Sequence, residues 1–137
     1  EEIDLCWRAN NVGHTIKYCP TSVVYHVGGA TLNEANPMKT FLNFRNSLLM
    51  LTKNLPKEKV FPIIFIRLCL DGLAGIQFLF QGKFKHTFAI LKAHFHFYHL
   101  IGRNLKKRTN NQKTDYFYTK SIVWNYFVQK KNTFNRI

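Results

Sequence analysis

Acidic residues and cysteines are scarce in this sequence, and the cysteine pattern excludes a class of protein. The chain of 137 residues has 7 Asp and Glu against 20 Lys and Arg, a net charge of +13. Its three cysteines are odd in number, widely spaced and without a CxxC pair, which excludes a disulfide-stapled secreted module and predicts reduced thiols. Aromatic residues, in contrast, make up 15%, which excludes a disordered tail.

The sequence also lacks an opening Met and a signal peptide, and begins inside an expected helix. We therefore expect the C-terminal piece of a longer protein. Its charge is uneven, because residues 1–82 carry eight basic and six acidic side chains, whereas residues 83–137 carry twelve basic side chains and one acid. This imbalance predicts an acidic partner for the second half, either a phosphate-rich polymer or an anionic lipid surface.

Apolar residues that recur every three or four positions predict that the chain is mostly helical. Asn36-Pro37 is a typical helix start, and Gly13 stands where a left-handed residue ends the first helix. The helices are expected over residues 2–12, 37–54, 57–80, 83–107 and 121–131.

Two short runs rich in Ile, Val and Tyr interrupt this helical pattern near the N-terminus. Thr15–Cys19 and Ser22–Val27 are separated by Pro20-Thr21, a typical turn. The sequence therefore predicts a short segment of two β-strands within a mostly α-helical chain.

Three acids and a histidine are the first candidates for chemistry. Glu1, Glu2 and Asp4 are close enough to raise one another's pKa, which suits a general base, although acids also favour the first turn of any helix. His26 ends the second apolar run before Gly28-Gly29, where an imidazole can bind a metal and glycines let backbone N–H groups approach a phosphate. A capping histidine before an ordinary turn is the alternative.

A succession of motifs in the first third of the chain resembles the end of the catalytic domain of family-two glycosyltransferases, which are inverting enzymes of the GT-A type. The residues that carry the resemblance are EEIDLCWR at 1–8, Gly13, Tyr18, Pro20, VVYH at 23–26, GG at 28–29 and KTFLNFRN at 39–46. The likeness is specific over residues 1–55 and implies the C-terminal fragment of an α/β, Rossmann-like enzyme. The helices that follow look like the amphipathic, membrane-associated tail of bacterial members.

The resemblance implies roles for residues at the start of the chain. The family has two adjacent acids, of which the second deprotonates the acceptor hydroxyl, so Glu2 is expected to be the base, with Glu1 and Asp4 beside it. Many members have Asp at this position, so Glu is a departure of one methylene. Trp7 is expected near the acceptor.

The resemblance also implies a donor side. His26, which follows Glu2 by 24 residues, is expected to help hold a divalent metal, Mg or Mn, on the donor diphosphate. The loop expected near the donor phosphates contains Gly28, Gly29 and Thr31. Arg45 is expected to neutralise the diphosphate or to pair with the acids, and a structural ion pair is the alternative.

An Asp-x-Asp motif, which supplies the other metal ligands in the family, is absent from this sequence. The implied function is transfer of a sugar from a nucleotide-diphospho-sugar to a hydroxyl acceptor with inversion, in cell-envelope polysaccharide or glycolipid synthesis. We expect this fragment to bind neither donor nor metal tightly, and to be inactive without its nucleotide-binding half.

The apolar residues 60–80 are long enough to cross ~30 Å of hydrocarbon, but Arg67 and Asp71 lie near the middle. Because charges there cost about 2.5–3.5 kcal/mol each, we expect an interfacial pair of helices at the cytoplasmic face of the inner membrane, peripheral or monotopic. A helix buried in a core is the alternative. The basic residues expected to face anionic lipid are Lys83, Lys85, Lys92, Arg103, Lys106, Lys107 and Arg108.

These features divide the chain into three parts, namely the end of a catalytic domain at 1–55, an apolar helical hairpin at 56–108, and a basic linker with a short helix at 109–137. Two other functions remain open. The basic tail with its aromatic residues permits a nucleic-acid-binding module, but it contains no recognised motif and leaves residues 60–80 without a role. A purely membrane-anchoring helical module is the other.

Overall fold

The computed structural model describes residues 2–25, 33, 35–109, 112–113, 122–131 and 133. Within these residues the chain is built from α-helices and the loops between them. The helices are α1 (Glu2–Asn11), α2 (Pro37–Asn54), α3 (Lys57–Phe80), α4 (Phe84–Leu105) and α5 (Ile122–Phe127). These bounds confirm the predicted helices to within a few residues, and for α2 they are identical to the prediction.

Local capping explains where these helices begin and end. The side chain of Asn36 accepts a hydrogen bond from the backbone N–H of Met38 at 2.9 Å, and Pro37 occupies the first helical position, where its missing N–H is not needed. Gly13 after α1 and Gly82 after α3 have φ of 95° and 69°. Both angles lie in the left-handed region that glycine adopts without steric penalty.

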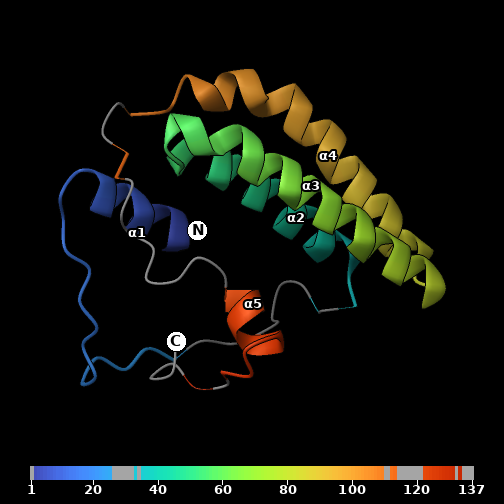
Figure 1. Ribbon diagram of the computed structural model, residues 1–137, viewed down its shortest axis with the longest axis horizontal. Helices are drawn as coiled ribbons and strands as arrows, with labels where there is room; N and C mark the ends of the chain where they lie inside the picture. Colours follow the sequence, from blue (N-terminus) through green and yellow to red (C-terminus); the bar gives the residue numbers. More distant parts are fainter. Residues whose placement is uncertain are drawn as a thin grey trace.

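Helices α2, α3 and α4 lie side by side, and α1 packs against α2 (Figure 1). The core between the three long helices consists of two groups of apolar side chains. Phe41 of α2 packs on Ala89 and Ala93 of α4. The second group joins all three helices and consists of Leu48, Ile64 and Phe97. The two alanines leave room for the Phe41 ring, so α2 and α4 approach closely along their lengths.

The predicted pair of β-strands is wrong, because none of the described residues from His14 to Tyr25 is in a strand. The turn at Pro20-Thr21 does form, since the N–H of Ser22 donates to the carbonyl of Cys19 at 3.2 Å. Its flanks stay apart and exposed to solvent, and Tyr25 is 95% exposed. An isolated hairpin is at best marginally stable without a third strand or an apolar surface beneath it, and here neither is present among the described residues. The implied α/β, Rossmann-like fragment is therefore corrected to a helical arrangement.

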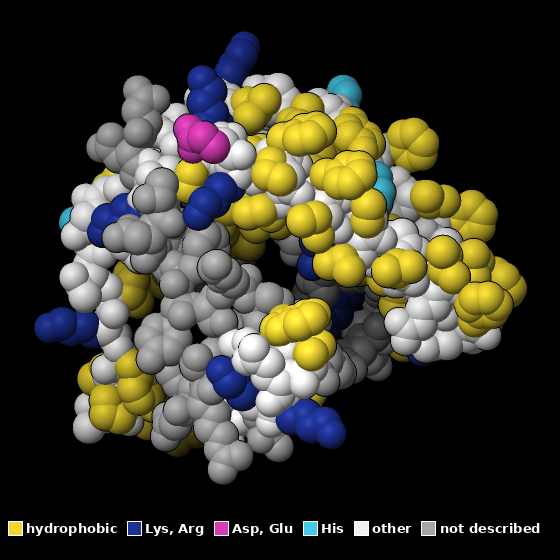
Figure 2. Space-filling model, in the orientation of Figure 1, with side chains coloured by type: hydrophobic (Ala, Val, Ile, Leu, Met, Phe, Trp, Pro, Cys, Tyr) yellow, Lys and Arg dark blue, Asp and Glu magenta, His cyan; other side chains and the backbone are white. Residues whose placement is uncertain are grey.

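The long aromatic stripe of α4 faces outward rather than into the core. Its members are Phe84, Phe88, Leu91, Phe95 and Tyr98, all exposed. The narrower face of α4, formed by Ala89, Ile90, Ala93 and Phe97, is the buried one. Apolar side chains accordingly gather over α3 and α4 on the surface shown in Figure 2. Helix α3 is also long and apolar enough to cross a membrane, judged by length and composition alone.

Candidate active site at the first helix

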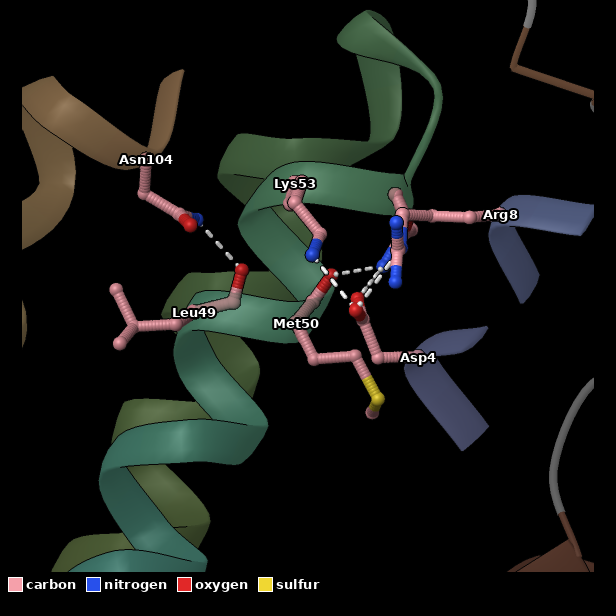
Figure 3. A network of polar contacts seen from close by, with 7 residues as sticks. Asp4, Arg8, Leu49, Met50, Lys53 and Asn104 are labelled. Atoms are coloured by element: carbon pink, nitrogen blue, oxygen red, sulfur yellow. Dashed lines mark hydrogen bonds and ion pairs between the residues drawn. The ribbon is translucent and has the colours of Figure 1, made fainter. Parts of the chain in front are cut away.

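Asp4 attaches α1 to the C-terminal end of α2 (Figure 3). Its Oδ2 accepts hydrogen bonds from Lys53 Nζ at 2.7 Å and from Arg8 Nε at 3.1 Å. Its Oδ1 accepts one from Asn54 Nδ2 at 2.8 Å. Asp4 and Arg8 are four residues apart, the spacing at which side chains meet on one face of a helix.

These partners determine the charge state of Asp4. Burial alone raises the pKa of a carboxyl group, but the hydrogen bonds from Lys53 and Asn54 and the charges of Lys53 and Arg8 outweigh it, so the pKa of Asp4 lies below its ordinary value. Asp4 is thus ionised and both of its oxygens are occupied. This acid positions α1 and is unsuited to accept a proton at neutral pH.

Replacing Asp4 by Asn is expected to lower the free energy of unfolding by about 1–2 kcal/mol at pH 7, because the ion pairs that attach α1 to α2 are lost. The folded pKa lies below the unfolded one, so the contribution is complete well above pH 4 and disappears as the pH falls through the folded pKa. Urea titrations at pH 7 and pH 3 measure this difference. The exposed Glu58→Gln is the control, and an equal loss at both pH values contradicts the prediction.

Glu2 has a different environment, although it lies only two residues before Asp4. It is exposed and borders an open hollow of about 420 Å³ on the side of α1. The residues that line this hollow are Glu2, Ile3, Cys6, Trp7, Asn10 and Ile16. A carboxylate and a half-buried indole therefore line one hollow, and their expected roles as base and acceptor-side residue stay predictions.

A second hollow of about 400 Å³ lies between α1, α2 and α4, and Ile3 lines both. Its wall is rich in amide and hydroxyl groups, contributed by Asn43, Asn46, Ser47 and Asn104. Asn43, Asn46, Ser47 and Met50 lie at helical spacing on α2, so one helix presents them to the same space. Such groups donate and accept hydrogen bonds, which suits a ligand that carries several hydroxyls.

Arg45 does not reach the acids of α1. Its Nε and Nη2 donate to Oδ1 of Asn46 at 3.0 and 2.9 Å, and its guanidinium lies 4.9 Å from the centre of the Phe41 ring. The partner of Asp4 on α2 is Lys53 instead. Among the described residues, Arg45 therefore forms neither the expected pair with these acids nor a structural ion pair, and its expected role in neutralising a diphosphate stays a prediction.

The remaining donor-side candidates lie outside the described residues. They are His26, Gly28, Gly29 and Thr31, and Glu1, the acid expected beside the base, also lies outside the described residues. Within the described part of the chain, no three His, Cys, Asp or Glu side chains converge on one point. The described residues therefore do not form a ligand set for a divalent metal, and the chemistry below gives none of them a metal-binding role. The three cysteines are free thiols, as expected.

Most basic residues expected to face lipid are on the surface, and one is not. The exposed ones are Lys83, Lys85, Lys92, Arg103, Lys106 and Lys107. Arg108 is instead turned inward, where its Nη1 donates to the carbonyl of Thr52 and its Nη2 to that of Leu55 at 2.6 Å. Burial lowers the pKa of Arg108, and it caps the end of α2 rather than facing a membrane.

The residues that the sequence did not single out are Lys53, Asn54 and the amides of the second hollow. Lys53 is separated from Asp4 by 49 positions, and no local pattern indicates that they meet. The helical spacing of Asn43, Asn46 and Ser47 is visible in the sequence, but without their neighbours these residues resemble an ordinary solvated face.

No known protein family, curated protein or solved structure matches this chain, so its function is inferred from its residues and their geometry.

Proposed function

We propose that this chain is part of an inverting glycosyltransferase that moves a sugar from a nucleotide-diphospho-sugar to a hydroxyl acceptor, with Glu2 as the base. The observation that carries the proposal is the position of Glu2, whose side chain lines an open hollow together with Trp7. The other described acid of α1, Asp4, is engaged with Lys53, Arg8 and Asn54 and holds α1 to α2.

The chemistry of sugar transfer requires such an acid. The acceptor hydroxyl loses its proton as its oxygen attacks the anomeric carbon, and the carboxylate of Glu2 takes that proton. A single displacement of this kind inverts the anomeric centre, whereas retention through a double displacement needs a second, nucleophilic carboxylate. Asp4 does not supply it, because both of its oxygens are engaged. The amide-lined hollow, which shares Ile3 with the hollow that Glu2 borders, offers hydrogen bonds to the other hydroxyls of the acceptor.

The remaining parts of the reaction belong to the complete enzyme. The nucleotide-binding half and a divalent metal, Mg or Mn, are supplied there, with His26 as the ligand from this chain. When bound, such an ion neutralises charge on the departing diphosphate. Because this chain contains one side of the site, the fragment alone is expected to show no turnover.

We place the enzyme at the cytoplasmic face of the inner membrane, as a peripheral or monotopic protein that builds a cell-envelope polysaccharide or a glycolipid. The apolar surface of α3 and α4 supports attachment to a membrane. The same surface favours a second candidate, a helical module whose only function is anchoring. It does not favour nucleic-acid binding, in which exposed Phe and Leu side chains on α3 have no role.

The proposal is tested by incubating the complete enzyme that contains this chain with radiolabelled nucleotide-diphospho-sugars and a membrane lipid extract. The expected result is a labelled glycan or glycolipid whose new anomeric centre, read by NMR coupling constants, is inverted relative to the donor. A retained centre contradicts the role given to Glu2. Absence of transfer by the complete enzyme, together with intact vesicle binding, assigns the chain to the anchoring module.

A further inference from the structure

The exposed half of α3 carries no charge along about five turns of helix. Between Phe61 and Phe80 every exposed residue is uncharged, and Gln77 is the one side chain among them with a polar group other than the thiol of Cys69. The large exposed apolar residues there are Phe61, Phe65, Ile66, Leu70, Leu73, Ile76, Leu79 and Phe80. In water such a surface is unfavourable, and its extent indicates a partner.

The two charges in the middle of α3 are turned the other way. Arg67 Nε lies 2.8 Å from Oδ1 of Asp71, and Oδ2 of Asp71 lies 3.2 Å from Nε2 of His94 on α4. Asp71 is only 1% exposed, and the Arg67 guanidinium lies 5.6 Å from the centre of the Phe44 ring on α2. Asp71 is thus buried and paired with Arg67 on the same helix. The Arg67 side chain is 37% exposed but lies outside the uncharged half of α3, so neither charge opposes contact of that half with hydrocarbon.

The aromatic stripe of α4 extends this uncharged surface. We name the exposed apolar residues of α3 and α4 together the apolar face, and Figure 2 shows apolar side chains of both helices on one side of the molecule. A row of exposed basic residues, Lys85, Lys92 and Arg103, follows α4 beside the stripe. Their spacings of 7 and 11 residues place them at nearly the same angle around the helix. Such a surface matches an anionic bilayer, because its apolar residues can enter the hydrocarbon while its basic residues contact the anionic headgroups.

The packing of α2 determines how this surface meets a bilayer. Helix α2 lies along α4 and contacts α3, and its own side chains include Asn43, Asn46 and Lys53. If α3 crossed the bilayer, α2 would enter the hydrocarbon with these polar groups. With α3 in the plane of the membrane, only the apolar face is immersed and α2 stays in water.

We propose that the α3–α4 hairpin docks in the plane of an anionic lipid bilayer through the apolar face, with its basic row at the headgroups, and does not span it. This inference deepens the proposed membrane localisation and rests on it. It does not depend on the transfer chemistry, so vesicle binding and sugar transfer can fail separately.

The docking is tested by flotation of the 137-residue chain with vesicles of phosphatidylcholine alone or with 30% phosphatidylglycerol. Binding is expected on the anionic vesicles and is expected to weaken in 0.5 M salt. Leu70→Glu and Phe88→Glu are expected to lower the partition coefficient about tenfold each, since each removes apolar burial and adds repulsion. The matched control Val24→Glu, at a position that is 83% exposed outside the apolar face, is expected to lower it much less.

Two results of this experiment overturn the proposal. If the chain does not float with the anionic vesicles, the partner of the apolar face is not a lipid bilayer. If, in addition, the chain sediments as a dimer that Leu70→Glu dissociates, the face belongs to a second copy. Equal weakening by Val24→Glu and Leu70→Glu likewise shows that total charge, rather than the apolar face, drives binding.

The orientation is tested with single cysteines at the two ends of α3. Lys57→Cys and Lys83→Cys are made singly in a chain in which Cys6, Cys19 and Cys69 have been replaced by Ser. A membrane-impermeant maleimide is then added to the outside of vesicles that carry the bound protein. In-plane docking predicts that both positions react. Reaction at only one end shows that α3 spans the bilayer and overturns the in-plane arrangement.

Discussion

Replacing Glu2 by Gln is expected to lower kcat of sugar transfer by about a thousandfold, which is within the range that removal of a general base produces. Glutamine has nearly the same size and keeps a hydrogen bond to the acceptor hydroxyl, but its amide does not accept the proton. KM for the acceptor is therefore expected to change little. Initial rates of the complete enzyme, measured against acceptor concentration, separate kcat from KM.

Two controls distinguish a base from an acid that only stabilises α1. Glu58→Gln removes an exposed carboxylate at the start of α3 and is expected to leave the rate unchanged. The acidic limb of the pH profile of kcat is expected to disappear in Glu2→Gln, which loss of stability alone does not produce. A residual rate within threefold of the parent enzyme contradicts the assignment, and the base must then be sought outside α1.

The helices were predictable because their determinants are local. The cap at Asn36, the break at Pro56 and the left-handed Gly13 and Gly82 each act within one turn, and an apolar period of three to four residues extends along the long helices. The ion pair of Asp4 with Arg8 is local in the same sense. These features need no knowledge of the tertiary structure.

The strands failed because β-structure depends on partners that the local sequence does not contain. Val23, Val24 and Tyr25 have high strand propensity, but that propensity reflects packing on a half-buried surface. Here the three side chains are exposed, so they lack the packing surface that would stabilise a strand. The same limit applies to the site, since the contact of Asp4 with Lys53 joins residues 49 positions apart.

The inner face of α4 shows a third limit. Helix α4 carries two apolar stripes, a bulky one from Phe84 to Tyr98 and a narrower one formed by Ala89, Ile90, Ala93 and Phe97. The structure buries the narrower stripe, because the close approach of α2 admits Ala89 and Ala93 beside Phe41 where larger side chains would clash. Total hydrophobicity alone therefore does not identify which face of α4 is buried. The close approach of α2 selects the face with the smaller side chains.

Phe97 and Phe95, two residues apart on α4, are expected to show opposite behaviour when each is replaced by Ala. Phe97 is 0% exposed and packs with Leu48 of α2 and Ile64 of α3, so Phe97→Ala opens a cavity where three helices meet. It is expected to lower the free energy of unfolding by about 3–5 kcal/mol. Phe95 is 74% exposed, and Phe95→Ala is expected to change the free energy of unfolding by no more than about 0.5 kcal/mol.

Urea denaturation followed by circular dichroism, without vesicles, measures both values. In flotation with anionic vesicles the expectation reverses, because Phe95 belongs to the apolar face and Phe97 does not. Phe95→Ala is expected to weaken binding severalfold, whereas Phe97→Ala binds normally under conditions in which it is folded. Equal destabilisation by the two variants contradicts the helix orientation on which both the core and the docking surface depend. A stable Phe97→Ala variant would show that α4 does not join α2 and α3 at this position.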